Sequence, residues 1–299
     1  MTDNHWDTLR RRAFAVAYRM LGAVGDAEDV AQEAVLRLSR LPEAPVEPAA
    51  WVTTVATRLA LDELRRARRR REAYVGPWLP EPLVDAPDPT PGPAERAELA
   101  DSLSLAFLVL LERLTPAERA AFLLREVFSE DYARIAAVLE RSEAGCRQLV
   151  SRARARLRQD RPRFDADPAA RRALLDRFLA AAEAGDVDGL TTLLAQDVVL
   201  YGDGGGIAPS PARPVHGAAA VAAFLVEIAA KRRVLGSFQL EHVDVNGQPG
   251  RVLRTEDGRV WDVLTVDVHG GRIEAVRVIR NPEKVAHLSQ DGSPGRHPS

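Results

Sequence analysis

A proline-rich stretch constrains the fold of this chain more than any other feature. Residues 76–94, GPWLPEPLVDAPDPTPGPA, contain seven prolines. Because proline has no N–H to donate and fixes φ, this stretch cannot continue a helix. We therefore predict an extended, semi-rigid linker at 76–94 that separates a domain at 1–75 from the rest of the chain.

The residues before this linker have the apolar spacing of α-helices. Gly22 to Gly25 interrupt a first helix, and Asp26 is predicted to be the N-cap of the second. A long third helix is expected from about Ala49 to Glu72. Residues 1–75 therefore predict an all-α domain.

Residues 95–163, after the linker, predict a second all-α domain that ends in a helix-turn-helix. Thr115 is the predicted N-cap of one helix. A short helix at 132–139 is then followed by a turn and by a helix that Ser142 caps. That last helix has an apolar stripe on one side and Arg and Gln on the other, which is typical of a helix that enters the major groove. An ordinary helical hairpin with a solvated basic face is the alternative.

Charge is distributed unevenly along the chain. The formal net charge is −2. Residues 58–71 nevertheless contain seven Arg and only two acidic residues, and residues 141–163 contain eight Arg and only two acidic residues. Two basic islands in an otherwise acidic protein favour two separate contacts with a polyanion. Charge alone leaves two solvated helix faces as the alternative.

Sequence features also indicate where the protein acts. Cys146 is the single cysteine, so no intramolecular disulfide can form. The N-terminal sequence lacks the apolar stretch of a signal peptide, and no apolar run approaches the ~20 residues of a membrane span. We therefore expect a cytoplasmic protein that does not associate with membranes.

The character of the sequence changes after residue 165. Helices are predicted at about 168–184, 187–195 and 217–230, and five Val-rich segments separated by Gly, Asp and Asn predict strands. Residues 168–288 therefore predict an α+β domain. The tail at 289–299 is expected to be disordered.

The helix-turn-helix segment LTPAERAAFLLREVFSEDYARIAAVLERSEAGCRQLVSRARARLR resembles region 4 of the extracytoplasmic-function (ECF) sigma factors of RNA polymerase. The resemblance implies binding to the −35 promoter element and to the β flap of the polymerase. Arg suits guanine and Gln suits adenine in the major groove, whereas the C-terminal arginines suit phosphates. The implied DNA contacts are Ser142, Arg147, Gln148, Ser151, Arg152, Arg154 and Arg158.

The segment DAEDVAQEAVLRL, followed by AWVTTVATRLALDELRR, resembles region 2 of the same family. In sigma factors the matching face of the first segment docks on the β′ clamp helices. The implied polymerase contacts are Asp29, Gln32, Glu33 and Arg37. Without the resemblance, this face predicts only a solvated charged surface.

The second of these segments corresponds to the reader of the −10 element. Opening a promoter requires bases to be unstacked, which a pocket and backbone charge must offset. The family captures a flipped base with the preceding loop, which has no aromatic residue here over 39–50. The candidate DNA contacts are Thr53, Thr54, Thr57, Arg58, Arg65 and Arg66.

Residues 168–288 resemble the SnoaL-like, nuclear transport factor 2-like fold, and three short motifs resemble a branch of ECF sigma factors in which this domain is fused. They are WLPEP from Trp78, DGGG from Asp203 and NPEK from Asn281. We hypothesise that WLPEP docks near the other two and that the domain is a built-in regulator, so that no separate anti-sigma factor is required. The residues of this contact are Trp78, Leu79, Pro80, Asp203, Gly204, Gly205, Gly206, Asn281, Pro282 and Glu283.

Other chemistry has little support in the sequence. Asp203, His216, His242, Asp262 and Asp267 are candidates for acid–base work, but no pair has a spacing typical of a catalytic dyad. We expect no catalytic residue, metal or cofactor, and an unidentified ligand in the C-terminal pocket stays open. Two alternatives are a helix-turn-helix regulator with a ligand-sensing domain and a SnoaL-like enzyme fused to a DNA-binding module.

Overall fold

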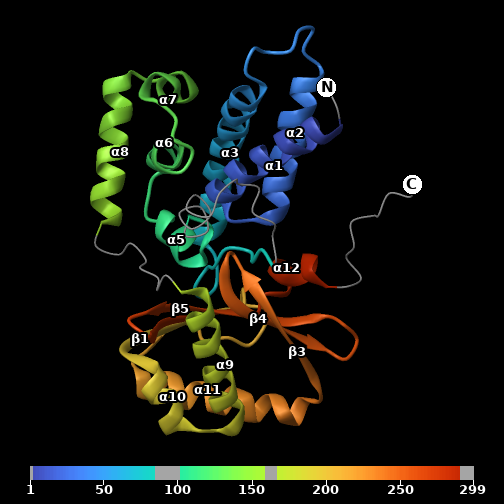
Figure 1. Cartoon of the computed structure of the whole chain (residues 1–299), viewed down its shortest axis with the longest axis vertical. Helices are drawn as coiled ribbons and strands as arrows, with labels where there is room; N and C mark the ends of the chain where they lie inside the picture. The colour runs from blue at the N-terminus through green and yellow to red at the C-terminus, as the bar shows by residue number, and fades with distance from the viewer. Residues whose placement is uncertain (1–2, 85–101, 159–166, 290–299) are drawn as a thin grey trace. The chain divides into compact units, whose positions relative to one another are not determined.

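The computed structural model describes residues 3–84, 102–158 and 167–289. The predictions for residues 85–94 of the linker and 290–299 of the tail lie outside these ranges. Within them, no helix combines the length and the apolar character that crossing a membrane requires. The chain folds into two compact units (Figure 1).

The first unit is all helical and combines the two helical segments that flank the proline-rich linker. Over the described residues, both predicted all-α segments are confirmed, including the break near Gly22 and the helix-turn-helix, while 95–101 and 159–163 of the second segment lie outside them. The helices are α1 (Asp3–Leu21), α2 (Val24–Ser39), α3 (Pro48–Glu72), α5 (Leu105–Leu111), α6 (Pro116–Glu126), α7 (Tyr132–Leu139) and α8 (Glu143–Leu157).

Polar caps set where several of these helices begin. Thr115 forms a capping box with Glu118 at the start of α6, and the Ser142 hydroxyl accepts the Gly145 N–H at the start of α8, as predicted. The prediction for Asp26 is wrong, because α2 begins at Val24, with Ala23 as its N-cap. Asp26 instead lies in the first turn, where its charge favours the positive end of the helix dipole.

A buried arginine joins the two helical segments. Arg119 on α6 is 1% exposed, and its guanidinium donates to the Arg19 carbonyl of α1 at 3.1 Å and forms an ion pair with Glu112. Burial alone raises the pKa of Glu112, but the charges of Arg119 and Arg71 outweigh burial and lower it. A buried ion pair of this kind is strongly destabilising to break, so it fixes how α1 and α6 pack.

The second unit is built on one six-stranded sheet in the order β2-β1-β6-β5-β4-β3. Strands β1 and β6 pair in parallel, and the other neighbours are antiparallel. The Asn246–Gly247 turn of the β3–β4 hairpin has positive φ at both residues, as a two-residue hairpin turn requires. The strands are β1 (Leu194–Asp203), β2 (Val215–His216), β3 (Phe238–Val245), β4 (Gln248–Thr255), β5 (Val260–His269) and β6 (Arg272–Ile279).

Helices α9 (Pro168–Ala184), α10 (Val187–Leu193) and α11 (Ala218–Leu235) cover one face of this sheet (Figure 1). Their apolar side chains form a common core with β1, β5 and β6. The prediction of an α+β domain is confirmed, although α11 is longer than predicted and the two-residue strand β2 was not predicted. A strand of two residues has too little alternation for a sequence pattern to reveal it.

Part of the linker belongs to the second unit. Residues 74–84, which include the WLPEP motif, fold against the α+β domain. The short helices α12 (Pro282–Val285) and η1 (Ala286–Leu288) follow β6 and provide part of the surface that these linker residues contact.

Candidate functional site

Helix α8 presents a basic face to solvent. The apolar residues predicted for its other side, among them Cys146, Leu149 and Val150, are buried against α6 and α7. All seven candidate DNA contacts are exposed: Ser142, Arg147, Gln148, Ser151, Arg152, Arg154 and Arg158. The structure therefore leaves the predicted face accessible.

Several arginines of α8 form ion pairs with neighbouring carboxylates. Arg154 pairs with Glu126 at 2.7 Å, and Glu118 holds both Arg152 and Arg156, at 3.2 and 2.7 Å. Burial raises the pKa of Glu118, but hydrogen bonds from Thr115 and Arg152 outweigh burial and lower it. The pair of Arg154 and Glu126 lies at the surface and contributes little stability, so Arg154 can exchange this carboxylate for a DNA phosphate at small cost. Glu118 is buried, with 4% of its side chain exposed, so Arg152 and Arg156 can leave it only at a larger cost.

Helix α2 carries the predicted polymerase-binding face. Asp29, Gln32 and Arg37 are exposed, Glu33 is half-buried, and Arg37 pairs with Glu33 at 2.7 Å. Leu36 lies on the same side and is 40% exposed. Sequence reasoning missed Leu36 because it looked for charged groups, whereas an exposed large apolar residue also marks a contact surface.

Two candidate DNA contacts on α3 face the protein interior. Thr53 and Thr57 are each 1% exposed, and their hydroxyls donate to the backbone carbonyls of Ala49 and Thr53. Arg12 of α1 also donates to the Thr53 hydroxyl at 2.7 Å. The orientation expected for these two side chains is corrected, because they lie on the same face of α3 as its buried alanines and leucines.

The remaining candidates on α3 lie closer to the surface. Thr54 is half-buried, whereas Arg65 and Arg66 are exposed and pair with acidic residues three positions earlier. Arg58 donates to the carbonyls of Ala137 and Val138 at the end of α7, at 2.8 and 3.1 Å. Cations are favoured at the negative end of a helix, so this contact competes with DNA for Arg58.

The second unit holds the linker around one carboxylate. Asp203, at the end of β1, is fully buried. One of its oxygens accepts the Tyr74 hydroxyl at 2.5 Å and the Gly205 N–H at 3.2 Å. The other oxygen accepts the Leu79 N–H at 2.8 Å and the Lys284 ammonium at 2.6 Å. Each oxygen thus has two donors, so the buried charge is fully compensated.

Lys284 closes this arrangement from α12. Its ammonium also donates to the Leu79 carbonyl at 2.5 Å and lies over the rings of Tyr74 and Trp78, 4.6 and 4.4 Å from their centres. Burial and the bond to Asp203 raise the pKa of Tyr74. Asp203 therefore binds the N–H of Leu79 and Lys284 binds its carbonyl. The aromatic rings shield the ammonium from water.

The role of Lys284 was missed in the set of contact residues. The chain contains two lysines among its 41 basic residues. A lysine in a chain that otherwise uses arginine could have marked Lys284 as a residue with a specific contact. Pro282 and Glu283 of the same motif are exposed, and the Asn281 side chain caps α12. These residues position Lys284, while Leu79, Pro80 and Pro82 of the linker are buried.

The glycines of the DGGG motif allow this close packing. Gly205 and Gly206 have φ of +63° and +73°, a conformation that side chains disfavour. A Cβ at Gly205 would lie 2.3 Å from the Asn281 side chain, and one at Gly206 would lie 3.1 Å from Val75. At Gly204, a Cβ would lie 2.1 Å from the Ala208 carbonyl.

The end of the docked linker joins the sheet edge. Leu83 exchanges hydrogen bonds with Asn246, since its N–H donates to the Asn246 side chain at 3.0 Å and its carbonyl accepts the Asn246 N–H at 2.8 Å. Val84 then forms an antiparallel bridge with Val245 of β3. The contact thus extends from Tyr74 to Val84.

The acidic and histidine candidates of this domain do not form a catalytic pair. Asp262 pairs with Arg251, and Asp267 pairs with Arg277. His242 contacts Asp176 at 3.1 Å on the exposed surface, and His216 is exposed on β2. Among the described residues, no group of three possible ligands could hold a metal ion.

Three family models match successive parts of the chain. Residues 6–70 match sigma-70 region 2, residues 104–157 match sigma-70 region 4, and residues 175–280 match the SnoaL-like domain. These ranges agree with the helical unit on both sides of the linker and with the α+β unit.

One relative matches the chain over nearly its full length, and another matches part of it. The chain is 39% identical over 293 residues to the ECF RNA polymerase sigma factor SigJ of Mycobacterium tuberculosis, covering 95% of this chain and 93% of SigJ. The crystal structure of that organism's SigJ matches with a TM-score of 0.76 and 36% identity, covering 98% of this chain and 99% of SigJ. SigG of the same organism is 33% identical over 221 residues, covering 65% of this chain and 59% of SigG.

The promoter-reading domains and the fused domain therefore occur together and in the same order as in SigJ. A match over nearly the full length of both chains also excludes an unrelated regulator that shares only a helix-turn-helix. This protein belongs to the ECF RNA polymerase sigma factors, with region 2 and region 4 domains that direct promoter recognition and transcription initiation and a C-terminal SnoaL-like domain.

Proposed function

We propose that the face of α2 around Asp29, Gln32, Glu33 and Arg37 binds the β′ clamp helices of core RNA polymerase, with Leu36 as its apolar centre. The exposed face of α8 binds the −35 element, and Arg58, Arg65 and Arg66 of α3 serve the −10 element. Exposure, basic charge and exchangeable ion pairs support these roles.

We further propose that the SnoaL-like domain is a built-in regulator that acts by holding the linker. The observation that carries this proposal is the buried pair of Asp203 and Lys284, which binds the N–H and the carbonyl of Leu79. Because these contacts engage the main chain at a fixed residue, they favour one register of the linker over all others.

Linker docking would limit how far the two promoter-reading domains can separate. Residues 74–84 directly follow α3 and precede α5 in the chain. If they were released, these residues could span up to about 36–40 Å when fully extended, and the added reach would be the difference between this length and the distance that they span when docked. This restraint is the proposed means of regulation, and it would act without a separate anti-sigma factor.

A catalytic role for the domain is disfavoured. Among the described residues, the acidic candidate in the cavity is Asp262, which is neutralised by Arg251, and no histidine lines the cavity with it. We therefore propose a non-enzymatic protein that acts with RNA polymerase in the cytoplasm. The enzyme alternative would need a desolvated Asp/His pair, which these residues do not supply.

The regulatory proposal is tested by transcription in vitro with core polymerase and the full-length chain. Trp78→Ala removes one of the rings over Lys284 and should loosen the linker. We expect promoter-dependent transcription to change several-fold. Val234→Ala is the matched control, because Val234 is an exposed apolar residue of the same unit with no role in docking.

If Trp78→Ala raises hydrogen exchange in residues 74–84 but transcription stays equal to that of Val234→Ala, the docked linker does not regulate promoter use. The assignment as a sigma factor would be untouched by that result, since it rests on regions 2 and 4.

A further inference from the structure

The SnoaL-like domain contains a partly open cavity of about 70 Å³ between the sheet and the helices α9 and α11. This space is separate from the linker contact, although Gly202 and residues 209–211 line it on one side. Since one water needs roughly 10–15 Å³ by this measure, a volume of about 70 Å³ accommodates about five to seven non-hydrogen atoms. The cavity thus suits a small organic molecule.

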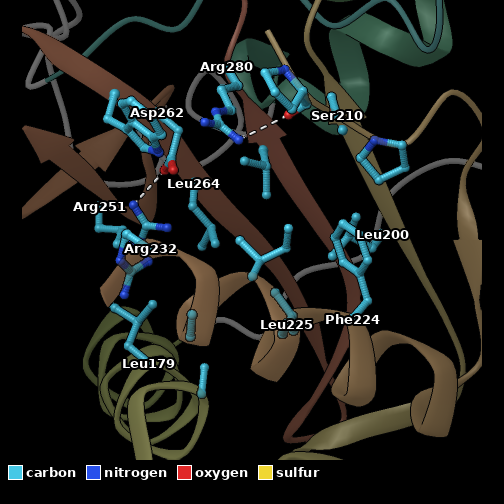
Figure 2. Close-up of a pocket in the computed structure, with 18 of the residues that line it drawn as sticks. Leu179, Leu200, Ser210, Phe224, Leu225, Arg232, Arg251, Asp262, Leu264 and Arg280 are labelled. Atoms are coloured by element: carbon cyan, nitrogen blue, oxygen red, sulfur yellow. Dashed lines mark hydrogen bonds and ion pairs between the residues drawn. The ribbon is translucent and has the colours of Figure 1, made fainter. Parts of the chain in front are cut away.

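The walls of the cavity divide into an apolar part and a cationic part. Figure 2 shows Leu200, Phe224 and Leu225 on one side of the view. Three arginines, Arg232, Arg251 and Arg280, lie with Asp262 toward the other side. Phe224 and Leu225 pack against the domain core but are only partly buried. An occupant with an apolar body would complete their burial.

Positive charge is in excess at the cationic end. Arg251 and Asp262 pair at 2.5 Å, and both side chains are more than nine-tenths buried. Arg232 pairs with Glu183. The remaining cation, Arg280, donates to the Pro209 carbonyl at 3.0 Å and lies 4.2 Å from the centre of the Trp261 ring. Among the described residues, no carboxylate forms an ion pair with Arg280.

Arg280 is partly buried. Desolvation lowers its pKa, and the nearby charge of Asp262 offsets only part of this effect. A partly desolvated guanidinium is stabilised best by an anion that accepts two parallel N–H bonds from it. The Trp261 ring can hold the guanidinium plane while its edge remains available to such an anion.

We propose that this cavity binds a small monocarboxylate with an apolar body of about seven non-hydrogen atoms in total, the size that its volume admits. The carboxylate pairs with Arg280, and the body lies against Phe224 and Leu225. The pair of Arg251 and Asp262 closes the cationic end without net charge, so Asp262 does not repel the ligand.

The test uses the full-length chain and ligand-observed NMR titrations with isovalerate, a branched monocarboxylate of this size. Its uncharged counterpart, 3-methylbutan-1-ol, and acetate, which lacks the apolar body, are compared with it. We expect isovalerate to bind at least about tenfold more tightly than either, because a hydrogen bond to a charged group is worth about this factor. Equal affinities for isovalerate and the alcohol would overturn the proposal.

A matched pair of variants locates the site. Arg280→Gln should weaken isovalerate binding about tenfold. Arg177→Gln, which changes an exposed arginine on α9, should leave it unchanged. Thermal unfolding of both variants verifies that they are folded. Unchanged binding by a folded Arg280→Gln protein, or no saturable binding of isovalerate by the wild type at tens of millimolar, contradicts the proposal.

Discussion

Two ionic surfaces of this protein are built in opposite ways. On α8, Arg154 and Arg147 pair with Glu126 and Glu143 at the surface, where water and salt compete for both partners. At the linker, Asp203 and Lys284 pair where both side chains are almost completely buried. Exposed pairs can exchange partners cheaply, whereas breaking a buried pair is costly. The surface of α8 is therefore suited to reversible binding of DNA, and the linker contact is suited to one permanent partner.

The largest expected effect comes from breaking the buried pair. Lys284→Met leaves the Asp203 carboxylate buried without its cation, which should destabilise the protein by about 3–5 kcal/mol. Urea unfolding measures this loss. The double variant Asp203→Asn, Lys284→Met removes both charges and should recover part of it. If Lys284→Met unfolds at the same urea concentration as the wild type, the pair does not secure the linker.

A smaller loss is expected from the DGGG loop. Gly205→Ala forces a side chain into a conformation with φ of +63° and against Asn281, so we expect a loss of about 1–3 kcal/mol. Gly25→Ala is the control, because a Cβ there meets nothing within 4 Å and the helical position favours Ala by about 0.5–1 kcal/mol. Opposite shifts in the thermal unfolding midpoint are predicted, and equal shifts would contradict them.

Tyr74 should make the stability of the protein depend on pH in the alkaline range. Burial and Asp203 raise its pKa above the unfolded value of about 10. Its contribution to stability is therefore fully present below about pH 10 and is lost as pH rises toward the folded pKa. Between about pH 9 and 11, the unfolding free energy of the wild type should fall more steeply than that of Tyr74→Phe. Parallel slopes would show that Tyr74 is not in this environment.

The smallest effect on stability should come from α8. Arg154→Gln breaks an exposed pair with Glu126 and should change stability by no more than about 0.5 kcal/mol. It should nevertheless weaken promoter binding by the holoenzyme and reduce the salt dependence by about one phosphate contact. Titration at several salt concentrations measures this slope. A large loss of stability in Arg154→Gln, with no change in the salt dependence of promoter binding, would contradict the contrast between the surface of α8 and the buried linker pair.

The helical unit was largely predictable from local patterns. Thr115, Pro116 and Ser142 mark helix starts by chemistry that acts within three residues, and the apolar stripe of α8 has a helical period. Asp26 failed as an N-cap because helix α2 extends three residues further toward the N-terminus, with Ala23 as its N-cap. Thr53 and Thr57 were placed on the wrong face because threonine is compatible with both buried and exposed positions.

The linker site was predictable only in part. The motifs WLPEP, DGGG and NPEK indicated which segments meet, since each combines rigid or unusually flexible residues with polar groups. Sequence spacing could not assign Tyr74, Asn246 and Lys284 to this site, because their partners are far away in the sequence. The separations are 129 positions for Tyr74, 163 for Asn246 and at least 81 for Lys284. Contacts at such separation depend on the tertiary fold.

The contrast between an exchangeable surface and a permanent contact is tested most directly by hydrogen exchange in residues 74–84. Exchange is measured in the free protein and in the holoenzyme bound to promoter DNA. Because Leu79 donates its N–H to buried Asp203, we predict equal protection of this segment in both states. Loss of protection on promoter binding would contradict it, since the linker would then be released when the protein acts.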